Sequence, residues 1–234
     1  MHIHLEKHPK KPIIVEGFPG VGLIGTIATE YLIEHLECEQ IGSIFSDNIQ
    51  PMIAMHKGKI VDPIGIFFSE KFNLVIVHVS SNMAKMEWEI ADALLQLAKV
   101  LDAWEIVCVE GVFDQEHSES KLLYYSNATH CHEKLKDTYE PLQEGLVMGV
   151  TGCLLLKAKQ SHCSALFAST HSIMPDSIAA SKVIEALDLY LGLGVDTKPL
   201  LKSAQEFEKK LHLQQDSVQK SLSDKEKKNI SYVG

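Results

Sequence analysis

The sequence lacks the features that mark several classes of protein. It has five cysteines in 234 residues, and because none lies in a Cys-x-x-Cys pair, we expect reduced thiols rather than a disulfide framework. Its apolar runs, such as that over 74–79, are too short to cross a bilayer. The first residues contain no apolar segment of the kind found in signal peptides. These absences predict a cytoplasmic protein with no membrane partner.

Positive charge is also scarce relative to negative charge. The chain has 22 basic and 31 acidic residues, which gives a formal net charge of -9. Proteins that bind nucleic acids present a basic face that replaces phosphate counterions. We therefore expect no nucleic-acid partner. Hydrophobic residues make up 45% of the chain, which is ample for a globular core.

Hydrophobic patterns alternate between short strands and amphipathic helices along most of the chain. This alternation predicts an α/β fold, a three-layer α/β/α sandwich with a mixed, mostly parallel sheet. Apolar residues thin out near the end, so we expect one α/β domain over 1–205 and a polar helical or mobile tail over 206–234. The predicted strands are 13–15, 41–45, 52–56, 60–61, 65–69, 74–79, 106–109, 146–150 and 165–168. Of these, 52–56 and 60–61 are expected to form a hairpin, and 74–79 is apolar on both faces like a central parallel strand. The predicted helices are 23–36, 87–101, one between the last two strands, and 177–191, which Asp176 should cap and Gly192 should end, with 114–134 unassigned.

A glycine-rich turn, Gly17-Phe-Pro-Gly-Val-Gly-Leu-Ile-Gly25, joins the first predicted strand to the first predicted helix. Its Gly20-x-Gly22-x-x-Gly25 spacing formally matches the dinucleotide-binding fingerprint. The acidic residue that this motif requires about twenty positions later does not fall at the end of a second strand. Glycines also permit positive φ and close packing of a strand against a helix. We favour the packing interpretation and leave ligand binding open.

Four residues are predicted to lie at the carboxyl ends of strands, where open α/β sheets bind ligands. Gly20 and Gly22 follow the first strand, Glu110 follows the strand over 106–109, and His171 follows the strand over 165–168. They form a candidate site for a small ligand such as a nucleotide or nucleoside. The chain has no Gly-x-Ser-x-Gly elbow and no Gly-Lys-Ser/Thr phosphate loop. We assign no catalytic residue and no cofactor.

The tripeptide His130-Cys131-His132 resembles part of a metal site. Adjacent side chains point apart, and no second group of ligands has suitable spacing. We therefore predict histidines on a polar surface loop and no metal site.

The residues from Glu16 to Gly25 resemble the opening motif of the PAC2 family, the proteasome assembly chaperone 2 family. The segment 149–158 resembles that family's second glycine turn and helix, and 175–200 resembles its closing helical segment. The resemblance implies a phosphorylase/hydrolase-like fold, and archaeal members are similar to eukaryotic proteasome assembly chaperones. It therefore implies a non-enzymatic chaperone or adaptor that forms a homo-oligomer. Its partner would be the proteasome 20S core or its α-subunits.

Several such proteins carry a C-terminal hydrophobic-Tyr-any motif that inserts between proteasome α-subunits, where the terminal carboxylate pairs with a lysine. By this resemblance, Tyr232, Val233 and the carboxylate of Gly234 are the candidate partner-binding residues. Tyr232 stands third from the end instead of second, and Ser231 precedes it. In this register Ile230 or Val233 would supply the apolar contact.

Overall fold

The computed structural model describes residues 1–49, 54–56, 59–80, 83, 85–114, 120–159, 161–171 and 174–203. The chain divides into two compact units, Met1–Val195 and Asp196–Gly234. In the second unit, residues 198–203 are helical. The tail predicted over 206–234, with its candidate partner-binding residues, lies outside the described residues.

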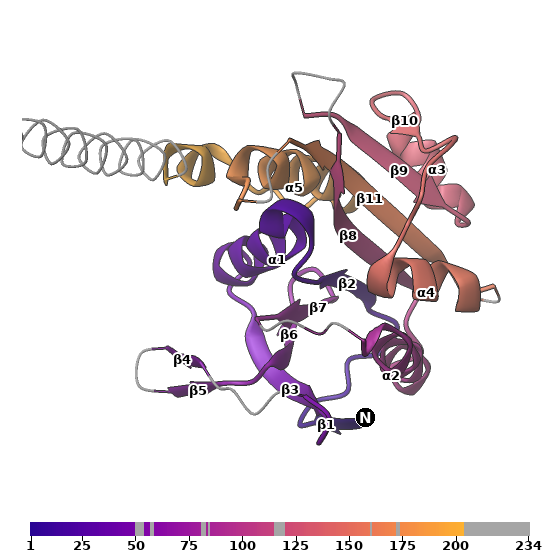
Figure 1. Ribbon diagram of the computed structural model, residues 1–234. Helices are drawn as coiled ribbons and strands as arrows, with labels where there is room; N and C mark the ends of the chain where they lie inside the picture. Colours follow the sequence, from indigo (N-terminus) through magenta and orange to yellow (C-terminus); the bar gives the residue numbers. More distant parts are fainter. Residues whose placement is uncertain are drawn as a thin grey trace, which may run out of the picture. The chain divides into compact units, whose positions relative to one another are not determined.

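A nine-stranded mixed sheet forms the centre of the first unit (Figure 1). In spatial order its strands are β1 (His2–Leu5), β3 (Glu39–Phe45), β6 (Ile64–Ser69), β7 (Leu74–Val79), β2 (Ile13–Gly17), β8 (Glu105–Phe113), β11 (Cys163–Thr170), β9 (Leu122–Ser126) and β10 (Glu140–Pro141). The four central strands β7, β2, β8 and β11 are mutually parallel. Beyond them, β6, β3 and β1 continue antiparallel on one side and β9 joins antiparallel on the other. β10 pairs parallel with β9 at the far edge.

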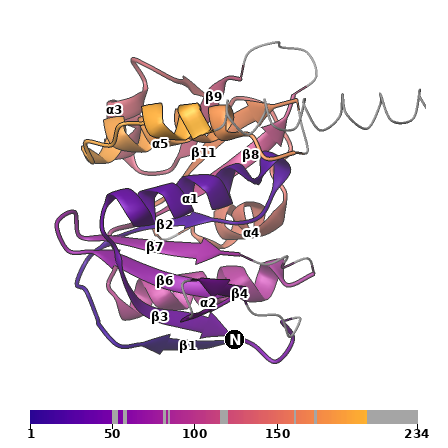
Figure 2. The same ribbon diagram turned by 90° about the vertical axis from the view of Figure 1, so that its left-hand side faces the viewer.

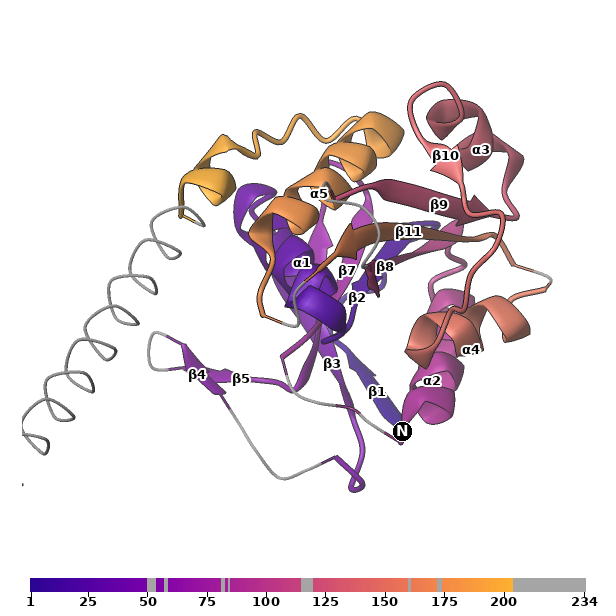
Figure 3. The same ribbon diagram turned by 45° about the horizontal axis from the view of Figure 1, so that its top comes forward.

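Helices cover both faces of this sheet (Figure 2). On one face α2 (Glu87–Val100) packs beside α4 (Gly149–Lys157). On the other face α1 (Ile24–His35), which follows the short 3-10 turn η1 (Val21–Leu23), packs beside α5 (Ser177–Leu191), and α3 (Thr129–Leu135) contacts α5 and β9. The two helix pairs are separated by the sheet in a third view as well (Figure 3). The predicted α/β fold with a mixed sheet is therefore confirmed.

Burial on both faces explains the continuous apolar sequences of the central strands. Residues 74–77 of β7 and 106–109 of β8 are each at most 1% exposed. A strand with helices above and below needs apolar side chains in both directions. β7 has the predicted central place, and it is also where the sheet changes direction, because its other neighbour, β6, is antiparallel.

A second, two-stranded sheet consists of β4 (Ala54–His56) and β5 (Lys59–Val61). The two strands pair antiparallel, with Ala54 opposite Val61 and His56 opposite Lys59. This pairing confirms the predicted hairpin over its described residues.

The ends of α5 are set by the residues that the sequence indicated. The Asp176 side chain accepts a hydrogen bond from the Ala179 N–H at 2.9 Å, which satisfies one free donor of the first turn. At the other end Gly192 adopts φ +68°, the left-handed conformation that ends a helix at little cost in glycine.

The strand predicted over 146–150 is wrong. Gly149 instead opens α4, and the residues before it form no strand. Leu146 and Met148 are 81% and 70% exposed, so these two side chains are not packed into the core. A run of five apolar residues is compatible with either a strand or the start of a helix, and periodicity cannot separate the two.

Candidate functional site

The four parallel strands end at one edge of the sheet, and a cavity of about 480 Å³ lies there. A volume of this size is typical of small-molecule sites. The cavity is surrounded by the segments that follow β2 and β7, by the ends of β8 and β11, and by the starts of α2 and α4. We call it the sheet-edge cavity, and it is lined by Phe18, Pro19, Gly20, Val21, Met83, Glu87, Glu110, Gly111, Val112, Phe113, Leu146, Val147, Met148, Gly149, Val150 and Phe167.

The glycine turn after β2 is explained largely by close approach of backbones. A Cβ atom on Gly17 would lie 2.2 Å from the carbonyl oxygen of Gly25, and one on Gly25 would lie 2.7 Å from the carbonyl oxygen of Val109. Helix α1 can start against β2 and β8 only because both positions lack a side chain. Gly22 has φ +65°, a conformation that costs little only in glycine. These contacts support the packing interpretation of the motif.

Gly20 serves a different purpose, because it faces the carboxyl group of Glu110. A Cβ atom at Gly20 would lie 2.3 Å from Oε1 of Glu110, so the carboxyl group occupies the space that a side chain would take. The other oxygen, Oε2, accepts a hydrogen bond from the Thr151 hydroxyl on α4 at 3.2 Å. Two of the four residues predicted for a ligand site are thus brought together on the wall of the cavity.

Burial changes the protonation of Glu110. Loss of solvent raises the pKa of its carboxyl group from 4.5 to about 7, and hydrogen bonds from Thr151 and the Gly111 N–H offset only part of that rise. A carboxyl group with this pKa exchanges its proton near neutral pH. It can therefore act as a counter-ion whose charge depends on what occupies the cavity.

The other two predicted site residues lie outside the lining. Gly22 packs against Thr170 and Asp176, and its carbonyl accepts a hydrogen bond from the Asp176 N–H at 2.9 Å. His171 is exposed, and its Nδ1 donates to the Asp114 carbonyl at 2.6 Å. The four residues share a sheet edge but do not form one site.

A second buried acid, Glu16 on β2, escaped the sequence analysis. Its side chain is fully buried, and within the described part of the chain neither carboxyl oxygen meets the geometry of a hydrogen bond, although the Cys108 thiol and the Thr151 hydroxyl lie close enough to lower its pKa. Burial raises its pKa well above the usual range, and the charge of Glu110 adds to that effect. A glutamate directly after the apolar residues of the predicted strand over 13–15 was the signal that could have identified it.

His78 on β7 behaves as a structural histidine. Burial lowers the pKa of its imidazole to about 4, and its Nδ1 lies 2.9 Å from the Thr29 hydroxyl of α1. Because a buried imidazole is more stable without charge, His78 is neutral at neutral pH.

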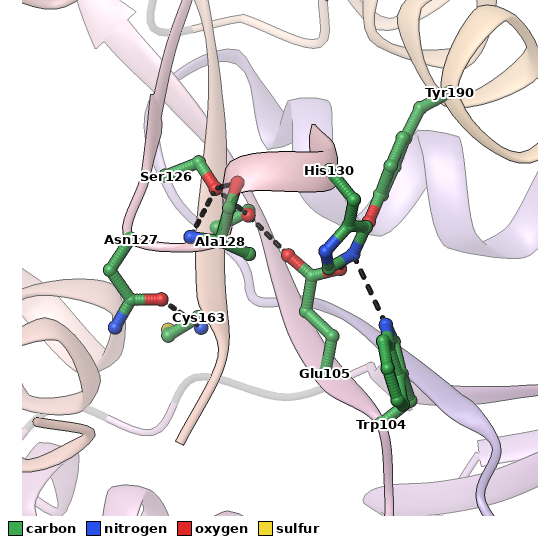
Figure 4. Close-up of polar contacts among 9 residues, drawn as sticks. Trp104, Glu105, Ser126, Asn127, Ala128, His130, Cys163 and Tyr190 are labelled. Carbon is green, nitrogen blue, oxygen red and sulfur yellow. Dashed lines mark hydrogen bonds and ion pairs between the residues drawn. The ribbon is translucent and has the colours of Figure 1, made fainter. Parts of the chain in front are cut away.

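A separate polar network lies at the opposite edge of the sheet, around Glu105 at the start of β8 (Figure 4). The fully buried Glu105 carboxylate accepts hydrogen bonds from the Tyr190 hydroxyl of α5 and the Ser164 hydroxyl of β11. It also lies 3.0 Å from Nε2 of His130 on α3. Ser126 on β9 extends the network, with its Oγ 2.7 Å from that of Ser164.

This Glu105 network joins three strands and two helices, and its geometry is that of a satisfied buried charge. Ser164 bonds to the carboxylate and not to the imidazole, so the serine has no adjacent general base of the kind a triad requires. Burial and the hydrogen bond to Glu105 raise the pKa of the Tyr190 hydroxyl, which therefore stays protonated and donates. The network stabilises the fold.

The tripeptide His130-Cys131-His132 lies on α3 and not in the polar loop that was predicted. Its histidines point to different partners, since His130 contacts Glu105 and His132 contacts the Tyr124 hydroxyl at 2.8 Å, while Cys131 is buried. Among the described residues no group of three His, Cys, Asp or Glu side chains could hold a metal ion. In the same part of the chain, no helix combines the length and the apolar character needed to span a bilayer.

The chain is similar to several archaeal proteins over nearly its whole length. A crystal structure of Pyrococcus furiosus PbaA, an archaeal homolog of proteasome-assembly chaperone, has a TM-score of 0.88 and 25% identity, and the match covers 99% of each chain. P. furiosus PbaB, an archaeal proteasome activator, has a TM-score of 0.77 and 22% identity over 92% of this chain and 98% of its own. An uncharacterized protein of Methanocaldococcus jannaschii is 26% identical over 96% of this chain and 94% of its own. The model of the PAC2 family matches residues 14–215, and the chain therefore belongs to the PAC2 family.

Proposed function

We propose that this protein is a proteasome assembly chaperone or adaptor that binds the 20S core through its α-subunits. The observation that carries the proposal is the match to PbaA, which extends over 99% of both chains at 25% identity. A likeness over the whole chain includes every element of the α/β body and is not confined to one common motif. The fold alone is also shared with PbaB.

The chemistry of the sheet-edge cavity is consistent with a role that is not enzymatic. Its described lining residues contain carboxyl groups but no serine, cysteine, histidine or lysine. Nucleophilic catalysis by a serine, cysteine, histidine or lysine needs such a side chain. The glycine turn, which could have been a phosphate cradle, packs α1 against the sheet and receives the Glu110 carboxyl.

We further propose that the protein acts as a cytoplasmic homo-oligomer that docks through Tyr232, Val233 and Gly234. Several copies of one short peptide on one oligomer would bind a ring of similar pockets with avidity, because each later contact is intramolecular. An aromatic side chain followed by an aliphatic one suits a hydrophobic pocket between subunits.

A binding assay with purified 20S proteasome tests this proposal. The full chain, a Tyr232→Ala variant and a Tyr125→Ala variant would be compared, since Tyr125 is an exposed tyrosine on the α/β body. We expect Tyr232→Ala to weaken binding at least tenfold and Tyr125→Ala to bind like the parent. Equal binding by all three would contradict docking through the tail, and no binding by the parent would contradict the proteasome as partner.

Size-exclusion chromatography with light scattering would test the oligomer. A mass several times that of the 26.1 kDa chain is expected, and a monomer at micromolar concentration would remove the avidity argument.

A further inference from the structure

The sheet-edge cavity has the apolar walls of a small-molecule site. Phe18, Val147 and Phe167 are among its lining residues, and Leu146 and Met148 extend it outward with exposed side chains. Binding sites for small molecules combine such walls with a few polar groups that fix orientation. An apolar body or stem would therefore gain affinity here by leaving water.

The polar groups on these walls are acidic. Glu87 and Glu110 are the ionisable side chains among the described lining residues, which include no lysine, arginine or histidine. An anion would meet repulsion here, whereas a cation would meet a carboxylate in a partly desolvated setting, where charge pairs are stronger than in water. The nucleotide considered from the sequence is disfavoured for a second reason. The Glu110 carboxyl lies against Gly20, on the glycine turn that would have to receive a phosphate.

The Glu110 carboxyl group has neutral hydrogen-bond donors as neighbours and no basic side chain among the described lining residues. Gly20 leaves room for the carboxyl group, and the Thr151 hydroxyl binds its Oε2. Glu16 lies nearby, fully buried, and neither of its oxygens meets the geometry of a hydrogen bond in the described part of the chain. One buried acid and one half-buried acid, with no base among the described lining residues, are a cost to folding. A bound positive charge would offset part of that cost.

We propose that the sheet-edge cavity binds a small free organic cation, an ammonium or guanidinium group on an apolar stem, with Glu110 as its counter-ion. The cavity lies within the first unit, so this binding requires neither the tail nor the proteasome. Failure of this proposal would leave the proposed function untouched, and the converse also holds.

Binding of a cation should be linked to proton release. Glu16 from β2 responds to the charge of Glu110, and Glu87 from α2 lines the same cavity, while α4 contributes the neutral Thr151 and β11 contributes Phe167. The described lining residues include no base that would compete for the role of the cation. Since a bound cation favours the carboxylate, affinity should rise by up to about tenfold per pH unit below pH 7 and level off above it.

Titration calorimetry on the full chain tests the proposal with three probes that share one apolar stem. These are 4-phenylbutylammonium, the neutral 4-phenylbutanol and the anionic 5-phenylpentanoate. We expect the cation to bind at least tenfold more tightly than either analogue at pH 7.5. At pH 6.5, comparison of two buffers with different ionisation enthalpies should reveal release of protons.

The variants are Glu110→Gln, which keeps the shape and an acceptor for Thr151, and Glu89→Gln, an exposed position on α2 outside the cavity. The first should lose the preference for the cation and the proton release, and the second should retain both. The proposal would be overturned by no saturable binding of the cation at millimolar concentration, or by equal binding of the anion. Unchanged binding in Glu110→Gln, or preference for a lysine-containing peptide over the free amine, would overturn it as well.

Discussion

Replacing Glu110 with glutamine should stabilise the protein, and the gain should depend on pH. The pKa of this carboxyl group is about 7 in the folded protein, against an ordinary value of 4.5. The folded state therefore holds the proton more tightly than the unfolded chain does. Between these two pH values the free energy of unfolding decreases as pH rises, because ionisation is disfavoured only in the folded state.

The magnitude follows from the interval between the two pKa values. At about 1.36 kcal/mol per pH unit, the carboxylate costs about 3 kcal/mol of stability at pH 8 and less than about 1 kcal/mol at pH 5. Glutamine carries no charge and can still accept from Thr151. Glu110→Gln should therefore be about 3 kcal/mol more stable than the parent at pH 8 and nearly equal to it at pH 5.

Urea denaturation followed by circular dichroism at pH 5, 6, 7 and 8 would measure this difference. Contributions from groups that do not interact with Glu110, including His78, are common to both proteins and cancel. Glu89→Gln, an exposed change on α2, should show a difference near zero at every pH. A gain that does not vary with pH, or a less stable variant at pH 8, would show that Glu110 is solvated or already paired.

Three further predictions concern packing, the Glu105 network and His78. Gly17→Ala should lower the free energy of unfolding by several kcal/mol in urea denaturation, because its Cβ would meet backbone atoms at 2.2 Å. Gly20→Ala should cost less, because its Cβ would meet a side-chain carboxyl group that can rotate away. Equal losses in the two variants would contradict this distinction. Tyr190→Phe should lower the free energy of unfolding by about 1–3 kcal/mol, because the buried Glu105 loses a donor, and an unchanged midpoint would show that water replaces the hydroxyl. In an NMR titration the His78 imidazole should protonate with a midpoint near pH 4, and a midpoint above 6 would show that it is solvated. Because folding lowers the pKa of His78, its contribution lowers the free energy of unfolding as pH falls from 6.5 toward 4.

The sequence predicted secondary structure correctly where a short segment is fully buried or where its own residues end a helix. The continuous apolar run over 74–79 predicted a central strand, and Asp176 and Gly192 predicted the ends of α5. These features depend on short-range chemistry that one segment carries by itself. The apolar run over 146–150 was ambiguous, because the exposure of Leu146 and Met148 is seen only in the folded structure.

The candidate site was predicted only in part for a similar reason. Strand ends identified the edge of the sheet at which the cavity lies, and Gly20 and Glu110 do meet there. The burial that raises the pKa of Glu110, and the presence of Glu16 beside it, arise from how β2, β8 and α4 come together. His171 was placed at the same edge by the same rule, yet its side chain turns to Asp114. A rule about strand ends fixes an edge and not the direction of a side chain.

The short border strand β10 limits how copies of this protein can pair through their sheets. It consists of two residues, Glu140 and Pro141, at one border of the sheet. Proline has no N–H to offer to another chain, and so short a border strand gives an incoming strand little to pair with. Copies are therefore discouraged from joining their sheets into a continuous ribbon at this border. A ring of subunits would then rely on side-chain contacts on other surfaces, on the opposite border at β1, or on the separate β4–β5 sheet.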